Sequence, residues 1–200
     1  MIGADTKAAQ RRALRALRAA LSPQQQARAA ERLAANVAAT RLFRASRRVA
    51  LYLSNDGEID THPLIQRIWA LHKRCYLPLL SRLRHDRLWF AEVLPDTPLA
   101  LNRYGIPEPS VPARRWLRAQ ELDLILLPLV GFDAAGNRIG MGAGFYDRSL
   151  AFLRGRSAWR KPQLLGLAHE VQRLEKLAPE PWDVPLQGVV TDRAVYWAKG

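Results

Sequence analysis

Apolar residues in the first forty positions follow the spacing of helices. Residues 6–20 are rich in Ala, Leu and Arg, which favour helix, and Leu14, Leu17 and Leu21 fall on one apolar stripe. This spacing predicts a helix whose leucine stripe packs on the rest of the protein. Four basic residues share another face of the same helix: Lys7, Arg11, Arg15 and Arg18.

A second helix is predicted from Pro23 to about Thr40. Ser22 is a good N-cap, Pro23 suits the first helical position, and Gln25 completes a capping box with Ser22. The residues predicted to face inward are Ala30, Leu33, Ala34 and Val37.

Further along the chain, short apolar runs bounded by turn-forming residues replace the helical spacing. Such runs are typical of buried strands. The predicted strands are residues 49–53, 75–78, 88–91, 124–130, 163–168 and 195–197. The predicted helices between them are 63–72 and 145–153, and the proline-rich segment 95–112 is predicted to be an irregular loop. Strands that alternate with helices indicate an α/β fold.

Length and composition suit one globular domain. The chain has 200 residues, of which 48% are hydrophobic and 24% charged. We expect one α/β domain over residues 1–200, with the helical pair 5–40 packed on it. Cys75 is the single cysteine, so no intrachain disulfide can form. The longest apolar run, 124–132, is too short to cross a bilayer and no signal peptide is seen, so we expect a cytoplasmic protein without a membrane partner.

Positive charge is concentrated at the start of the chain. The net charge is +13, and residues 1–48 hold eleven lysines and arginines against Asp5 and Glu31. A basic segment can bind nucleic acid or an anionic substrate, and its simplest interpretation is a solvated helix face. The histidines lack the spacing of metal ligands; they are His62, His72, His85 and His169.

A glycine-rich loop follows the apolar run 124–130. Gly140, Gly142 and Gly144 alternate, and Phe145 begins a predicted helix. Glycines let backbone N–H groups approach phosphate oxygens, so strand, loop and helix in this order are typical of a phosphate site. The spacing matches neither the P-loop nor the complete dinucleotide-binding pattern, and by itself it also describes a tight turn.

The residues beside this loop favour nucleotide chemistry. Arg138 places a cation just before the loop. Asp147 places a carboxylate just after it, where it can hold a metal that bridges phosphates. Phe145 and Tyr146 add aromatic surface.

Two further residues are candidates because of their position. Glu58 follows the predicted strand 49–53, and ligands of open α/β sheets bind at the carboxyl ends of strands. The same position also suits a carboxylate that stabilises the start of the next helix. Tyr104 lies in the proline-rich loop, where it either stacks on a planar ligand or packs against the protein.

The segment FDAAGNRIGMGAGFYDR, residues 132–148, resembles the signature of the 5-formyltetrahydrofolate cyclo-ligase family. Lys7 and Arg11 resemble the family's opening Lys-x-x-x-Arg helix. Pairing Arg11 with Arg15 would shift that helix by one turn; we prefer the first register because the chain then reaches Glu58 without a gap. Three more segments resemble the family in the right order: YLSNDGEIDT, YGIPEP and EPWDVPLQGVVTD.

This resemblance implies an ATP- and Mg²⁺-dependent ligase that cyclises 5-formyltetrahydrofolate, with or without a polyglutamate tail. Together with the order of elements, it predicts a three-layer αβα sandwich whose Rossmann-like, mainly parallel sheet carries helices on both faces. Arg138 and Asp147 would be catalytic, and Asp147 and Asp183 would hold Mg²⁺. The implied ATP contacts are Lys7, Arg11, Arg138, Ile139, Gly140, Met141, Gly142, Ala143, Gly144, Phe145 and Tyr146. The implied folate contacts are Leu53, Glu58, Tyr104, Met141, Gly142, Ala143, Gly144 and Phe145.

The expected partners are therefore the folate and ATP, and we expect a monomer that binds no nucleic acid. Two alternatives stay open. One is a basic nucleic-acid-binding protein, supported by the basic segment 1–48 and six tryptophans. The other is an ATP-dependent kinase or ligase of the same fold with a different acceptor.

Overall fold

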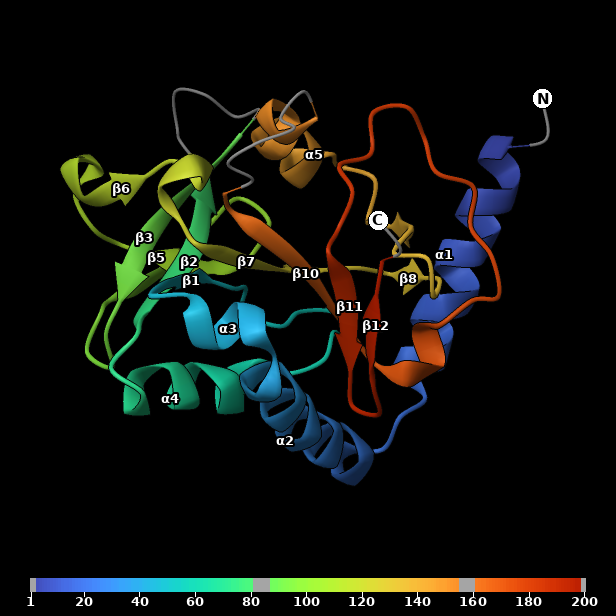
Figure 1. The fold of residues 1–200 in the computed structure, drawn as a ribbon, viewed down its shortest axis with the longest axis horizontal. Helices are drawn as coiled ribbons and strands as arrows, with labels where there is room; N and C mark the ends of the chain where they lie inside the picture. Colours follow the sequence, from blue (N-terminus) through green and yellow to red (C-terminus); the bar gives the residue numbers. More distant parts are fainter. Residues whose placement is uncertain (1–2, 81–86, 155–160, 199–200) are drawn as a thin grey trace.

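A mainly parallel sheet forms the centre of the protein. The computed structural model describes residues 3–80, 87–154 and 161–198. Within these ranges, eight strands form one sheet in the order β12-β11-β10-β7-β1-β2-β3-β6 (Figure 1). The central strands β11, β10, β7, β1 and β2 are parallel, and β12, β3 and β6 are antiparallel additions at the two edges. The strands are Arg48–Ala50 (β1), Arg74–Leu80 (β2), Leu88–Val93 (β3), Trp116–Leu117 (β6), Leu124–Pro128 (β7), Gln163–Ala168 (β10), Gly188–Thr191 (β11) and Val195–Trp197 (β12).

Helices and two small hairpins surround this sheet. The α-helices are Gly3–Ala19 (α1), Pro23–Ala39 (α2), Arg41–Ala45 (α3), His62–Ala70 (α4) and Phe145–Leu150 (α5). The 3₁₀ helices are Ala113–Arg115 (η1), Ala119–Glu121 (η2), Ala151–Leu153 (η3) and Glu170–Gln172 (η4). The hairpins pair Leu99–Leu101 (β4) with Pro107–Pro109 (β5) and Gly131–Phe132 (β8) with Arg138–Ile139 (β9).

The central strand β7 shows why its sequence is apolar at every position. Leu124 and Leu126 belong to a buried cluster on one face of the sheet, and Ile125 and Leu127 belong to a second cluster on the other face. Alternate residues of a strand point to opposite faces, so a strand buried on both sides has no polar positions. The two clusters place the sheet between two packed layers.

The two layers differ in thickness (Figure 1). The helices α2, α3 and α4 cover one face, where Leu33, Val37 and Phe43 pack in the first cluster. The other face packs against α5, η2, η3 and loops, and Leu150 of α5 lies in the second cluster. The predicted α/β fold with helices on both faces is confirmed. The predicted capping box of α2 is also present, with both Ser22 and Gln25 bonded.

Helix α1 lies beyond the β12 end of the sheet and away from α2 (Figure 1). Leu14 packs there in a small cluster with Val130, which precedes β8, and Ile139 of β9. The predicted leucine stripe is wrong in part, because Leu17 is 51% exposed. Arg18, predicted on the basic face, is completely buried instead. Its Nη2 atom forms a tertiary ion pair with Asp56 Oδ2 at 2.8 Å.

Three other predictions need correction. Segment 95–112 is not wholly irregular, because β4 and β5 form a hairpin in it; prolines are compatible with such edge strands. The first strand ends at Ala50, since the chain then leaves the sheet and the Tyr52 carbonyl accepts a hydrogen bond from Thr61 Oγ1 at 2.5 Å. The predicted helix 145–153 is α-helical only to Leu150 and continues as η3. The short helix α3 has no counterpart among the predictions, and His85 lies outside the described residues.

Candidate active site

A cavity of about 840 Å³ opens at the carboxyl ends of β1, β2 and β7. Parallel strands end at one edge of a sheet, so the loops that follow them meet there. Helix α1, the β4–β5 hairpin, the glycine loop and the segment 180–183 complete the walls. Every residue predicted for the site lines this cavity: Lys7, Arg11, Leu53, Glu58, Tyr104, Arg138, Ile139, Gly140, Met141, Gly142, Ala143, Gly144, Phe145, Tyr146, Asp147 and Asp183.

The glycine loop is open at Gly140 and Gly142, whereas a Cβ atom added at Gly144 would lie 2.6 Å from Arg148 Nη1. A Cβ atom added at Gly140 would have no heavy atom within 4 Å, and one added at Gly142 would meet only Arg11 Cζ, at 3.9 Å. Gly142 and Gly144 need glycine for another reason, because their φ angles are +100° and +68°. Among the backbone hydrogen bonds of the described residues, none uses the N–H of these three glycines. The loop therefore offers free donors to an anion.

Arginines hold the carbonyl side of the same loop. Arg11 Nε donates to the Gly140 carbonyl at 2.9 Å, and Arg148 Nη2 donates to the Ala143 carbonyl at 2.7 Å. Arg138 donates to the Val184 carbonyl and to Asp147 Oδ1. Arg11, Arg138 and Arg148 therefore concentrate positive charge at this wall of the cavity.

Lys7 reaches the cavity from the start of α1 and pairs with Glu180 Oε1 at 2.5 Å. Lys7 and Arg11 both line the cavity, whereas Arg15 pairs with Asp56. The structure thus brings the preferred pair of the predicted Lys-x-x-x-Arg motif to the glycine loop.

Two aspartates lie on the glycine-loop side of the cavity. Asp147 has a side chain that is 29% exposed, and Arg138 occupies one of its oxygens. Asp183 Oδ2 accepts the Glu180 N–H at 2.8 Å. In the described part of the chain, no three His, Cys, Asp or Glu side chains gather in a way that could hold a metal. Two carboxylates suit Mg²⁺ that arrives with phosphate oxygens, because Mg²⁺ commonly keeps few protein ligands, so the donor set fits that cofactor.

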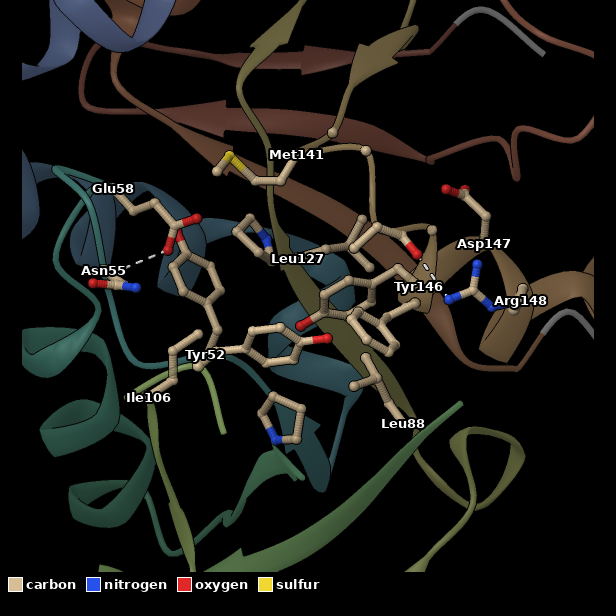
Figure 2. Close-up of a pocket in the computed structure, with 18 of the residues that line it drawn as sticks. Tyr52, Asn55, Glu58, Leu88, Ile106, Leu127, Met141, Tyr146, Asp147 and Arg148 are labelled. Carbon is tan, nitrogen blue, oxygen red and sulfur yellow. Dashed lines mark hydrogen bonds between the residues drawn. The ribbon is translucent and has the colours of Figure 1, made fainter. Parts of the chain in front are cut away.

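Glu58 lies on the opposite side of the cavity from Asp147 and Arg148 (Figure 2). Its Oε2 accepts the Asn55 N–H at 3.2 Å. Burial raises the pKa of Glu58 to about 7, against the lowering effects of the Asn55 hydrogen bond and of Arg18. Helix α4 takes Thr61 as its N-cap and has no acidic residue in its first turn, so the helix-capping interpretation of Glu58 is not supported.

Tyr104 stands at the mouth of the cavity and is exposed. Its ring meets the ring of Phe145 edge to face, with centroids 6.2 Å apart. Arg103 lies over the outer side, 4.8 Å from the ring centroid. The two aromatic rings join the β4–β5 hairpin to the glycine loop, and both line the cavity.

Comparison with known proteins gives the family. The sequence pattern described as the 5-formyltetrahydrofolate cyclo-ligase family matches residues 4–192. The chain belongs to this family.

Curated cyclo-ligases support the assignment over nearly the whole chain. The 5-formyltetrahydrofolate cyclo-ligase of Escherichia coli is 40% identical over 185 residues, which cover 92% of this chain and 98% of the relative. The protein of that name from Haemophilus influenzae is 41% identical over 175 residues, covering 86% of this chain and 90% of the relative. The predicted family and enzyme class are confirmed.

Solved structures agree with the fold. The 5,10-methenyltetrahydrofolate synthetase of Aquifex aeolicus is 29% identical, covers 97% of this chain and 93% of its own, and gives a TM-score of 0.82. A synthetase of the same name from Mycoplasma pneumoniae, 23% identical with a TM-score of 0.69, covers 94% of this chain and 99% of its own and supports the fold. Within the described ranges of this cyclo-ligase family member, no helix combines the length and apolar character needed to cross a bilayer.

Sequence reasoning missed much of the cavity of this cyclo-ligase family member. The apolar wall comes from strand ends and the β4–β5 hairpin: Leu77, Pro78, Leu80, Leu88, Ile106, Leu127 and Pro128. Most of these residues lay in predicted strands, Leu80 lay just beyond one and Ile106 lay in the predicted loop, so position near the carboxyl end of a strand was the usable signal. Tyr52 was also missed; burial raises the pKa of its hydroxyl, and the nearby Glu58 adds to that effect. Trp182 is exposed and lines the cavity, and only its position next to Asp183 in the sequence could have indicated this.

Proposed function

We propose that this protein catalyses the ATP- and Mg²⁺-dependent cyclisation of 5-formyltetrahydrofolate to 5,10-methenyltetrahydrofolate, with release of ADP and phosphate. One observation carries the proposal: a single cavity joins an open glycine loop with cations to a half-buried carboxylate in an apolar wall. The first half suits a triphosphate, and the second suits a planar ring system that carries N–H donors. The names of the relatives in E. coli and Aquifex aeolicus support the same reaction.

The chemistry requires activation of the formyl oxygen, because oxide or hydroxide leaves a carbon centre poorly. That oxygen attacks the γ-phosphorus of ATP, the bond from phosphorus to the β–γ bridging oxygen breaks, and ADP leaves. Nitrogen 10 of the folate then attacks the formyl carbon of the imidate phosphate and loses its proton. The carbon–oxygen bond breaks as phosphate departs, and the five-membered ring closes. Neither step requires a covalent bond between the substrate and the protein.

The glycine-loop side would serve the phosphoryl transfer. Such transfer depends mainly on positioning and charge neutralisation, so Arg138, Lys7 and Arg11 would bind the triphosphate together with the loop N–H groups. Asp147 and Asp183 would hold Mg²⁺, which supplies charge neutralisation at phosphate oxygens when bound. Arg138 also fixes Asp147, because it donates to one carboxylate oxygen and leaves the other available.

The opposite side would bind the folate. An ionised Glu58 can accept two N–H donors from the amino edge of the pterin ring, a charge-assisted arrangement. Leu53 and the apolar wall would cover the ring faces. Tyr104 and Phe145 would close the cavity around the folate, next to Met141.

The direct test mixes purified protein with 5-formyltetrahydrofolate and Mg-ATP and follows the absorbance of the methenyl product. We expect growth of the signal that requires both ATP and Mg²⁺. ADP release without methenyl product would contradict the folate assignment, and other formamides tested for phosphate release would then identify the acceptor. Binding to nucleic acid with no response to ATP would favour the nucleic-acid alternative.

A further inference from the structure

Helix α1 reaches both sides of the cavity. Near its start, Lys7 and Arg11 line the glycine-loop side. In its last turn, Arg18 lies under the turn 55–58, which carries Glu58. One helix therefore contacts the walls assigned to both substrates.

Arg18 is an unusual residue to bury. Its side chain has no exposed surface, and Nη2 donates to Asp56 Oδ2 at 2.8 Å. Its Nε and Nη1 atoms find no hydrogen-bond partner within the described structure. A buried charged group with unmade hydrogen bonds costs free energy. Arg15 already pairs with the same Asp56 oxygen at 2.8 Å from the surface, so holding Asp56 does not by itself explain a buried arginine.

The turn above Arg18 has a strained backbone. Asp56 and Gly57 both adopt positive φ angles, +52° and +73°. The Glu58 N–H donates to the Asn55 carbonyl at 3.0 Å, and the Asn55 N–H donates to Glu58 Oε2 at 3.2 Å. A Cβ atom on Gly57 would lie 3.6 Å from Arg18 Cγ, so the arginine packs directly against the turn. The position of the Glu58 carboxylate thus depends on this support.

His169 lies under the same turn. It is 1% exposed, and Arg18, Asp192 and the Gly57 backbone are its polar surroundings. Burial lowers the pKa of His169 and nearby Arg18 acts in the same direction, while Asp192 and the Gly57 backbone oppose them. A neutral His169 leaves Arg18 as the buried cation beneath Glu58.

We infer that Arg18 is a positioning residue for Glu58: it supports the 55–58 turn and so holds the Glu58 carboxylate where it meets the N–H donors of the substrate. This role rests on the proposed function, since it concerns the binding of the folate. It extends the site beyond the residues that line the cavity, to a side chain that touches no substrate.

The electrostatics agree with this geometry. The groups that face Glu58 are Arg18 from α1, Asp56 and the Asn55 backbone from its own turn, and the hydroxyls of Tyr52 and Tyr146. Lys7 and Arg11 line the same cavity. Arg18 lowers the pKa of Glu58, whereas burial and Asp56 raise it. Removing the charge of Arg18 therefore raises that pKa and leaves less ionised Glu58 at neutral pH.

The test compares Arg18→Gln with Arg15→Gln, which removes a cation from the same Asp56 oxygen but leaves the buried one in place. We would measure kcat/KM for 5-formyltetrahydrofolate from pH 5.5 to 9, and KM for each substrate. For Arg18→Gln we expect the acid limb to move up by about 0.5–1 pH unit and the folate KM to rise about 10-fold, with ATP KM changed less than about 3-fold. Arg15→Gln should follow wild type, and Arg18→Lys should restore the midpoint.

The outcomes separate the inference from the proposed function. If wild type forms no methenyl product, the proposed function fails. If wild type is active and Arg18→Gln matches Arg15→Gln, or raises both KM values equally without moving the midpoint, the positioning role is refuted. Should Arg18→Gln not fold, wild type and Glu58→Gln decide: the acid limb of wild type must lie at higher pH than the limb that ATP leaves in Glu58→Gln, and coincident limbs refute the role. ATP titrates in every variant, so the difference between variants isolates Glu58.

Discussion

The two sides of the cavity differ in how their charged groups are compensated. On the glycine-loop side, charges face one another in pairs, Arg138 with Asp147 and Lys7 with Glu180, beside an open backbone. On the opposite side, Glu58 is held by one backbone hydrogen bond in a largely apolar wall, and burial raises its pKa to about 7. The first arrangement tolerates large charge changes during reaction, as phosphoryl transfer requires. The second makes one carboxylate sensitive to what it binds, as selection of a neutral ring requires.

The largest effect is expected from a substitution on the glycine-loop side. Asp147→Asn keeps an oxygen acceptor for Arg138 but removes the charge proposed to hold Mg²⁺, so kcat should fall about 100-fold or more. Because Arg138 still donates to Val184, the stability loss should stay near 1 kcal/mol. Steady-state kinetics and thermal unfolding measure the two. Asp96→Asn, at an exposed aspartate outside the cavity, is the matched control; kcat near wild type in Asp147→Asn would rule out the metal assignment.

The next largest effect is expected from a substitution on the opposite side, at Glu58. Glu58→Gln still accepts the Asn55 N–H but loses the charge that matches two substrate donors. KM for 5-formyltetrahydrofolate should therefore rise about 10- to 100-fold, while KM for ATP stays within about 3-fold. Initial rates with each substrate varied in turn provide the measurement. A parallel rise of both KM values would mean that the two sides are not independent in substrate binding.

Glu58→Gln should also change the free energy of unfolding, by an amount that depends on pH. The pKa of Glu58 in the folded state, about 7, exceeds the ordinary value of 4.5, so its ionisation destabilises the fold as pH rises through 7. The stability gain of Glu58→Gln over wild type should grow from pH 5 to pH 8 and reach about 2 kcal/mol. Chemical denaturation at both pH values checks this. An equal gain at both would show that Glu58 carries no raised pKa.

The smallest expected effect concerns the open loop. Gly140→Ala meets no neighbouring atom and requires no positive φ, so stability should change by less than about 0.5 kcal/mol. If phosphates approach this backbone, the added methyl group should still raise KM for ATP about 5- to 10-fold. Gly142→Ala is the contrasting variant, because its φ of +100° should cost about 1–2 kcal/mol as well. An unchanged KM for ATP in Gly140→Ala would show that the triphosphate does not bind against Gly140.

The sequence predicted this site well where one short segment carries it. Residues 138–147 contain the loop, a cation and a carboxylate within ten positions, so their proximity needs no knowledge of the fold. Lys7, Glu58 and Asp183 came together because the family resemblance fixed their order, and the structure lines one cavity with them. The chemical roles of these residues stay predictions.

Tertiary contacts decided what the sequence could not show. Arg18 looked like part of a solvated face, yet the turn that carries Asp56, 38 residues away, covers it completely. Leu17 looked like a core residue, yet nothing covers that side of α1 enough to bury it. Helical spacing identifies faces but does not say which face meets the protein. The β4–β5 hairpin was missed for a related reason, because its prolines suppress a strand pattern that edge pairing accepts.

The position of α1 has a consequence for how the enzyme can lose activity. Among its described side chains, Leu14 is the one buried apolar residue, so α1 is held mainly by ion pairs and hydrogen bonds of its basic residues to distant parts of the chain. Segments with few buried apolar contacts detach at lower free energy than the core. Detachment of α1 would leave the sheet and its amide-exchange protection intact while removing Lys7, Arg11 and Arg18 together. A preparation in which α1 has detached would keep its folded sheet and still lose the cationic side chains that α1 brings to the cavity, most readily in high salt.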